Sequence, residues 1–264
     1  MLTELYGKAG QVCQAAKEGQ LRCPLIIRPT SEDVITGEIF QTLRCLQPRW
    51  WLPQLLNAAV GAERFRQQVY RRLTIKLWQN QPAYPRSLLP WDEGSTQVDV
   101  VMTWENPRTT VFIEMKYGSD LAADTVNSGG QTYPADQLIR NIRVGLWRCG
   151  WFRETGLFAD EPRDFVQVLL TPQAKHPLVA KYREHTKLLN AIPQHQRLRG
   201  LPTKPFVGEL SYDQLAGVLS NNRRWLSRPE QAMVDQLIEY LRFKLTTLKR
   251  TTSASRQPEL VGTV

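Results

Sequence analysis

Glu114 and Lys116 lie two residues apart in the segment TTVFIEMKY, and Asp99 precedes them in the segment QVDVVMTW. Both segments are rich in β-branched and aromatic residues, which is typical of strands. The segment ENPR between them has the composition of a turn, so a hairpin is predicted over residues 97–117. Because side chains two apart on a strand share a face, roughly 7 Å apart, the hairpin presents a carboxylate and an ammonium side by side.

The place of Asp99 relative to this pair depends on the length of the turn. If the dipeptide at 106–107 is its centre, Asp99 lies opposite Glu114, and if the centre moves on by one residue, Asp99 lies opposite Lys116. Residues directly opposite in an antiparallel pair share a face. Either even-length turn therefore gathers all three side chains, whereas an odd-length loop would separate them.

Two carboxylates and a lysine on one face suit metal-dependent hydrolysis of a phosphodiester. Carboxylate oxygens bind Mg²⁺, and the bound metal polarises a phosphoryl oxygen and lowers the pKa of a coordinated water. A lysine beside the metal orients that water or stabilises the charge that grows on phosphorus. The alternative is a plain cross-strand salt bridge on an exposed hairpin. The flanking valines, phenylalanine and isoleucine instead suggest a hairpin buried on both faces, where charges without a role are costly.

The segments GSTQVDVVM and FIEMKYGSDL resemble the D…ExK signature of the PD-(D/E)xK nuclease superfamily, although Val98 stands where that pattern has proline. The resemblance covers residues 30–172 and implies a restriction-endonuclease-like core. It also implies that Mg²⁺ or Mn²⁺ is held by Asp99, Glu114 and the backbone carbonyl of Met115. Lys116 would then be the catalytic lysine.

Two helices are expected to add residues to this site. Many members of the superfamily carry an acid on the first core helix, predicted here over residues 31–46. The apolar residues of that helix point in a direction close to Glu32 and away from Glu38, so Glu32 is the candidate, with N-terminal helix capping as its alternative role. Gln137, on the helix predicted over 134–148, resembles the family's helix glutamine. Its alternative is a solvated surface position.

The charge balance favours a polyanionic partner. The formal net charge is +9 and the pI is about 9.6, and nucleic acid is the commonest polyanion that such proteins bind. Arg140, Arg143 and Arg148 lie in a stretch without acids, so they are candidates for phosphate contacts, with a solvated helix face as the alternative. The tryptophans near residues 50 and 150 are expected in the core more often than stacked on bases.

The order of the other expected elements gives the architecture. Further helices are predicted over 61–72, 177–190, 211–220 and 229–248, and further strands over 74–78 and 165–172. The expected fold class is α/β, with a central mixed β-sheet flanked by helices and a helical C-terminal extension. The expected divisions are a lead-in over 1–29, the nuclease-like core over 30–172, the helical extension over 173–250 and a disordered tail over 251–264.

Cysteine usage and hydropathy indicate a cytoplasmic protein. The four cysteines form no CxxC pair and no zinc motif with the three histidines, so they are expected to be free thiols in a reducing compartment. No signal peptide and no apolar run long enough to span a membrane is visible in the sequence.

These observations together predict a DNA-directed, Mg²⁺-dependent nuclease with a role in phage defence, restriction or repair. An alternative is a catalytically inactive module of the same fold that binds nucleic acid or a partner protein. A third is an unrelated basic adaptor, which would be favoured if residues 97–117 did not form a hairpin. Assembly as a homodimer or with a partner subunit is left open.

Overall fold

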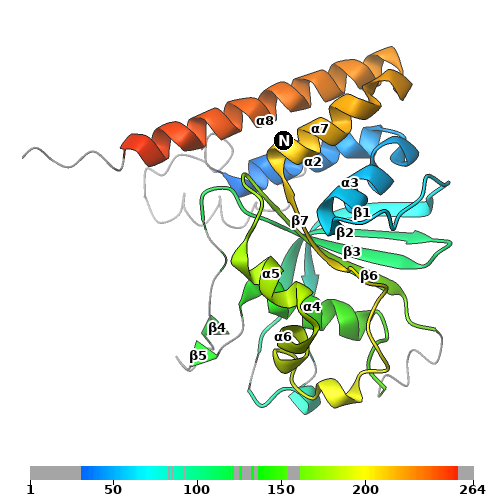
Figure 1. Cartoon of the computed structure of the whole chain (residues 1–264), viewed down its shortest axis with the longest axis vertical. Helices are drawn as coiled ribbons and strands as arrows, with labels where there is room; N and C mark the ends of the chain where they lie inside the picture. The colour runs from blue at the N-terminus through cyan, green and yellow to red at the C-terminus, as the bar shows by residue number, and fades with distance from the viewer. Residues whose placement is uncertain are drawn as a thin grey trace, which may run out of the picture.

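The computed structural model describes residues 31–254, apart from 83, 85, 92, 120, 122–124, 127–131, 134–135 and 154–160. In this part of the chain a five-stranded mixed sheet lies between two groups of helices (Figure 1). The expected α/β class with a central mixed sheet is therefore confirmed. The predicted lead-in over 1–29 and the tail beyond Ala254 lie outside the described residues.

The sheet has the strand order β1-β2-β3-β6-β7. The first three strands form an antiparallel meander, β6 pairs with β3 in parallel, and β7 pairs with β6 in parallel. A separate pair of short strands, β4 and β5, lies outside it. The strands are β1 (Arg71–Gln81), β2 (Thr96–Glu105), β3 (Thr109–Met115), β4 (Thr125–Val126), β5 (Thr132–Tyr133), β6 (Asp164–Thr171) and β7 (Val207–Ser211).

Helices cover both faces of the sheet, and each face has its own apolar core. One core joins the sheet to α2, α3, α7 and α8, and the other joins it to α4, α5 and α6 (Figure 1). The helices are α2 (Glu32–Cys45), α3 (Leu52–Val60), α4 (Gln137–Arg148), α5 (Pro177–Arg183), α6 (His185–Asn190), α7 (Tyr212–Asn222) and α8 (Arg228–Ala254). The sheet is thus the middle of three layers, as the burial of both its faces requires.

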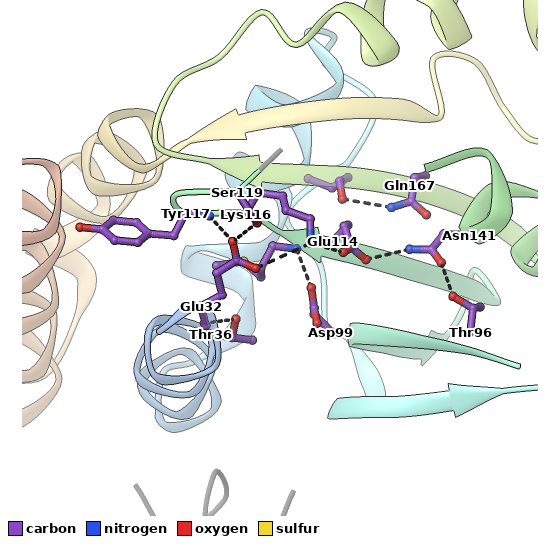
Figure 2. A network of polar contacts seen from close by, with 12 residues as sticks. Glu32, Thr36, Thr96, Asp99, Glu114, Lys116, Tyr117, Ser119, Asn141 and Gln167 are labelled. Carbon is purple, nitrogen blue, oxygen red and sulfur yellow. Dashed lines mark hydrogen bonds and ion pairs between the residues drawn. The ribbon is translucent and has the colours of Figure 1, made fainter. Parts of the chain in front are cut away.

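Helix α2 begins where the sequence predicts. The Ser31 hydroxyl accepts a hydrogen bond from the Val34 amide at 3.3 Å, which satisfies one of the free amides of the first turn. Glu32 and Asp33 in that turn suit the positive end of the helix dipole. This start places the Glu32 carboxylate at the end of the helix nearest the hairpin (Figure 2).

The helix predicted over residues 61–72 was wrong. The helical segment is α3, which ends at Gly61 in the left-handed conformation, with φ of 73°. After it the Asn57 side chain accepts hydrogen bonds from the Arg64 and Phe65 amides, and its amide group donates to the Phe65 carbonyl. These bonds give the backbone another set of partners, so the chain runs on in extended form into β1.

The segment after residue 172 is not only helical, which corrects the expected helical extension. β7 completes the sheet, and α7 and α8 bury their apolar residues in the same core as α2 and α3. Gly208 lets α3 approach β7, because a Cβ there would lie 2.6 Å from the Ala59 carbonyl oxygen. The helix predicted over 177–190 is two helices, α5 and α6, and α8 extends to Ala254, into the predicted tail.

Two expectations about the environment can be compared with the structure. No helix within the described residues is both long enough and apolar enough to cross a membrane. Cys45 and Cys149 are free thiols, the first exposed and the second buried.

Candidate functional site

The β2–β3 hairpin brings Asp99 and Glu114 together. The register pairs Trp104 with Thr109 and Val100 with Ile113, so the turn is centred on residues 106–107 and Asp99 lies opposite Glu114. The Met115 amide donates a hydrogen bond of 2.8 Å to Asp99 Oδ2, which fixes this carboxylate against β3. The first of the two even-length turns is therefore the one that the chain adopts.

Lys116 directs its ammonium between two carboxylates. Its Nζ lies 3.1 Å from Glu114 Oε1 and 3.7 Å from Glu32 Oε2, and all three side chains point toward one another (Figure 2). The Glu114 side chain is fully buried, whereas that of Glu32 is 29% exposed. We call Glu32, Asp99, Glu114 and Lys116 the carboxylate cluster. It is buried at Glu114 and open to solvent at Glu32.

Glu32 joins this cluster from α2, on the opposite layer from α4. Its Oε1 accepts hydrogen bonds from the Tyr117 amide at 3.0 Å and from the Ser119 hydroxyl at 2.6 Å (Figure 2). Glu38 on the same helix is exposed. The choice of Glu32 from the direction of the apolar face therefore agrees with the geometry.

Asn141 is a site residue that the sequence did not single out. Its amide nitrogen donates to Glu114 Oε2 at 2.9 Å, and its amide oxygen accepts from the Thr96 hydroxyl at 3.1 Å (Figure 2). Asn141 lies one helical turn after Gln137 and so on the same side of α4. Gln137 itself is half-buried, and no contact recorded among the described residues joins it to the cluster, so its catalytic role stays a prediction.

Burial and mutual repulsion shift the acidities of these groups. Burial raises the pKa of Asp99 to about 6, although the Met115 amide and the Lys116 ammonium oppose the rise. Burial and the neighbouring charge of Asp99 raise the pKa of Glu114 to about 8, against the effects of Lys116 and Asn141. Burial lowers the pKa of Lys116, but the charges of Glu114 and Glu32 outweigh it, so this pKa is raised. The one ammonium therefore does not fully offset the burial and mutual repulsion of the carboxyl groups, so the pKa values of Asp99 and Glu114 stay raised.

The donor atoms can be compared with the needs of a metal. The described residues contain no group of three or more His, Cys, Asp or Glu side chains arranged as a metal centre. The cluster nevertheless offers hard carboxylate oxygens, and the buried Glu114 Oε1 lies 3.1 Å from the Lys116 ammonium. Oxygen donors with excess negative charge fit Mg²⁺ or Mn²⁺ in kind. The Met115 carbonyl remains a predicted ligand.

The three predicted phosphate-contacting arginines do not form one surface. Arg143 is fully buried and pairs with Glu93 at 2.6 Å, with its guanidinium near the rings of Tyr84 and Trp91. Its assignment to nucleic-acid contact was wrong, because a carboxylate distant in sequence already neutralises it. Arg140 pairs with the same Glu93 at 3.1 Å. We call Glu93, Arg140 and Arg143 the arginine cluster.

Arg148 differs from these two because its side chain is exposed at the end of α4. Among the tryptophans, Trp51 is buried as expected, while Trp50 stacks on Trp225 with ring centroids 5.4 Å apart.

Comparison with known proteins gives no relative. No protein family, no curated protein and no solved structure matches this chain.

Proposed function

We propose that the chain is a metal-dependent nuclease that hydrolyses phosphodiester bonds of DNA. The observation that carries the proposal is the convergence of Asp99, Glu114 and Lys116 on one face of a buried hairpin, with Glu32 completing the cluster from α2. Three carboxylates against one ammonium at a partly open edge leave a buried excess of negative charge. Such an arrangement is costly in a structural salt bridge and useful where a cation is to be bound.

The order of elements supports the resemblance to the PD-(D/E)xK superfamily. The resemblance implies the order helix, strand, hairpin, helix, strand, and α2, β1, the β2–β3 hairpin, α4 and β6 follow one another in this order, with α3 inserted after α2. We infer that this part of the chain is a restriction-endonuclease-like core. β7, α7 and α8 then extend it at one edge and over one face.

Each residue of the cluster has a chemical task in this proposal. Asp99, Glu114 and the Met115 carbonyl hold Mg²⁺ or Mn²⁺, which supplies Lewis acidity when bound. Lys116 stabilises the charge that develops on the phosphoryl group or orients the attacking water. Asn141 fixes the orientation of Glu114 by a hydrogen bond, and Glu32 holds Lys116 from the solvent side. These residues together bind, orient and stabilise without forming a covalent intermediate.

One observation favours the second candidate, a catalytically inactive module that binds nucleic acid or a partner protein. The Lys116 ammonium lies within ion-pair distance of both Glu114 and Glu32, so the cluster is already linked internally. The described residues also lack a ready three-residue metal group. In such a module these charges serve only as salt bridges.

A cleavage assay with divalent metal separates the two candidates. Plasmid and linear DNA are incubated with the protein and Mg²⁺ or Mn²⁺, with EDTA as the metal-free control. Asp99→Ala is expected to abolish cleavage. Lys116→Ala is expected to reduce it by about 100-fold or more while leaving DNA binding nearly intact, because an ammonium offers only donors and cannot ligate the metal. Glu38→Ala, at an exposed position of the same helix as Glu32, is the control for charge loss.

Calorimetric titration of Mn²⁺ tests the same site without turnover. Wild type and Glu38→Ala are expected to bind the ion equally, and Asp99→Ala to bind it far more weakly. Equal binding by wild type and Asp99→Ala would reject the metal site. Cleavage that survives in both Asp99→Ala and Lys116→Ala would place the activity elsewhere. Metal binding without any cleavage by the wild type would favour the inactive module.

A further inference from the structure

A basic groove lies on the α4 side of the sheet, over parts of β1, β2 and β3. It has a volume of about 350 Å³ and is lined by Lys76 of β1, by Arg148 at the end of α4 and by Arg163 just before β6. Its floor includes Val101 and Phe112, which pair with each other across β2 and β3. The groove is therefore positively charged at its walls and apolar at its base.

The charge of this groove is only partly neutralised. Arg163 pairs with Glu105 at 3.1 Å, and both side chains are about 30% exposed. Lys76 and Arg148 are exposed, and no carboxylate among the described residues lies within ion-pair distance of either. Arg148 thus differs from Arg140 and Arg143 of the arginine cluster, which share Glu93. The groove retains cationic side chains that are free to contact an anion.

Hydrogen-bonding side chains line the same groove. Thr74 and Thr103 lie opposite each other on β1 and β2, with their hydroxyls 2.8 Å apart, and the amide side chains of Gln79 and Gln81 also border it. Hydroxyl and amide groups commonly contact phosphate and sugar oxygens, beside arginine and lysine. The combination suits a ligand with repeated anionic oxygens and some apolar surface.

The groove is aligned with the carboxylate cluster along the hairpin. Asp99 lies two residues before Val101 on β2, and Glu114 lies two residues after Phe112 on β3. Because side chains alternate between faces, the two carboxylates and the groove floor share the α4 face, roughly 7 Å apart along the strands. The groove floor and the two carboxylates are therefore neighbours on the same two strands.

We propose that this groove binds the sugar-phosphate backbone of one strand of nucleic acid next to the bond at the carboxylate cluster. This inference deepens the proposed nuclease function and rests on it. The groove has the volume of a small-molecule pocket, which suits a single nucleotide better than a duplex. Lys76, Arg148 and Arg163 contact phosphate oxygens, and the apolar floor accommodates the sugar or base.

The test is a binding measurement in EDTA, so that metal and cleavage play no part. A fluorescein-labelled single-stranded oligonucleotide, and the duplex of the same sequence, are titrated by fluorescence anisotropy over a range of salt concentrations. The variant Lys76→Glu/Arg148→Glu is expected to bind the single strand at least about tenfold more weakly than wild type. Its slope of log affinity against log salt should become shallower by about one for each phosphate that the variant no longer neutralises. The matched control is Arg242→Glu, an exposed position on α8 at the opposite face, which is expected to bind as wild type does.

Several outcomes would overturn the groove. The first is an unchanged affinity and salt slope in Lys76→Glu/Arg148→Glu. The second is an equal loss of affinity in Arg242→Glu. The third is a loss of affinity for the duplex but not for the single strand. Thermal unfolding of each variant identifies a folding defect, in which case Lys76→Gln/Arg148→Gln replaces the reversal and should show part of the same effect. If binding depends on the groove but the wild type cleaves nothing, the groove stands and the nuclease proposal fails. If cleavage depends on Asp99 and Lys116 but not on the groove residues, the nuclease proposal stands and the groove proposal fails.

Discussion

The carboxylate cluster and the arginine cluster both include charged residues on the α4 side of the sheet, but the ratio of acidic to basic groups is reversed between them. In the arginine cluster one carboxylate, Glu93, serves two guanidiniums, and Arg143 is sealed against aromatic rings. In the carboxylate cluster three acids share one ammonium, and the pKa of Glu114 is raised to about 8. Removing one partner from a buried ion pair is strongly destabilising, whereas carboxyl groups whose pKa is shifted by burial and by each other are candidates for a binding site.

The largest expected effect is on the arginine cluster. Arg143→Ala removes a fully buried side chain and leaves Glu93 paired with Arg140 alone, so it should lower the free energy of unfolding by about 3–5 kcal/mol. Arg148→Ala, at an exposed position of the same helix, should change it by less than about 0.5 kcal/mol. Urea denaturation at neutral pH measures both. Equal free energies of unfolding for Arg143→Ala and Arg148→Ala would mean that the arginine cluster does not stabilise the fold.

The next effect concerns the pH dependence of the carboxylate cluster without metal. The folded-state pKa of Glu114 is about 8 and that of Asp99 about 6, both above their ordinary values. Between about pH 4 and 8 the unfolded chain releases these protons while the folded chain keeps them, so stability falls as pH rises and levels off above pH 8. Because each pKa unit corresponds to about 1.4 kcal/mol, the two shifts predict a loss of several kcal/mol, measured by denaturation in EDTA.

A substitution separates Glu114 from the other titrating groups. Glu114→Gln imitates the protonated side chain, so it should remove most of the slope between pH 6 and 8 and be more stable than wild type at pH 8. Glu38→Gln should leave the slope of the wild type. Mn²⁺ should flatten or invert the wild-type slope, because the ion binds the deprotonated carboxylates. A wild-type profile that rises toward pH 8 in EDTA would contradict the excess of negative charge.

The smallest effect sharpens the comparison within α4. Asn141→Ala removes the hydrogen bond to Glu114 and should weaken Mn²⁺ affinity by about 10- to 100-fold, the range for a residue that orients a metal ligand. Gln137→Ala, one turn away, is the matched control, and its effect measures the role that the sequence assigned to it. Calorimetry gives both affinities. If Gln137→Ala has the larger effect, the glutamine rather than the asparagine positions the site.

The sequence was a good guide where geometry follows from local rules. The alternation of side chains on a strand and a short turn were enough to place Asp99 opposite Glu114, and helical periodicity was enough to choose Glu32 over Glu38. These inferences use spacings of a few residues. They do not depend on how distant parts of the chain pack.

The failures come from contacts that are distant in sequence or chemically inconspicuous. The burial of Arg143 depends on Glu93, 50 positions earlier in a segment without periodicity. Asn141 has a neutral amide side chain, so in the sequence it looks like an ordinary surface residue. The one signal for it is its place one helical turn after Gln137. β7 has five residues and follows a proline-rich segment, so its pattern is too short to distinguish a strand from a loop. The misplaced helix at 61–72 reflects the side chain of Asn57, which no periodicity reveals.

Because α7 and α8 are part of the core, the surroundings of the carboxylate cluster can fold only late in synthesis. The Tyr117 hydroxyl donates to the carbonyl of Lys244, 127 positions later, at 2.7 Å, and the Tyr212 hydroxyl donates to the carbonyl of Lys116 at 3.2 Å. α2, which carries Glu32, packs against α8. A chain emerging from the ribosome therefore exposes every residue of the carboxylate cluster long before the framework around Lys116 can close. The framework around Lys116 is therefore complete only after synthesis has passed α8.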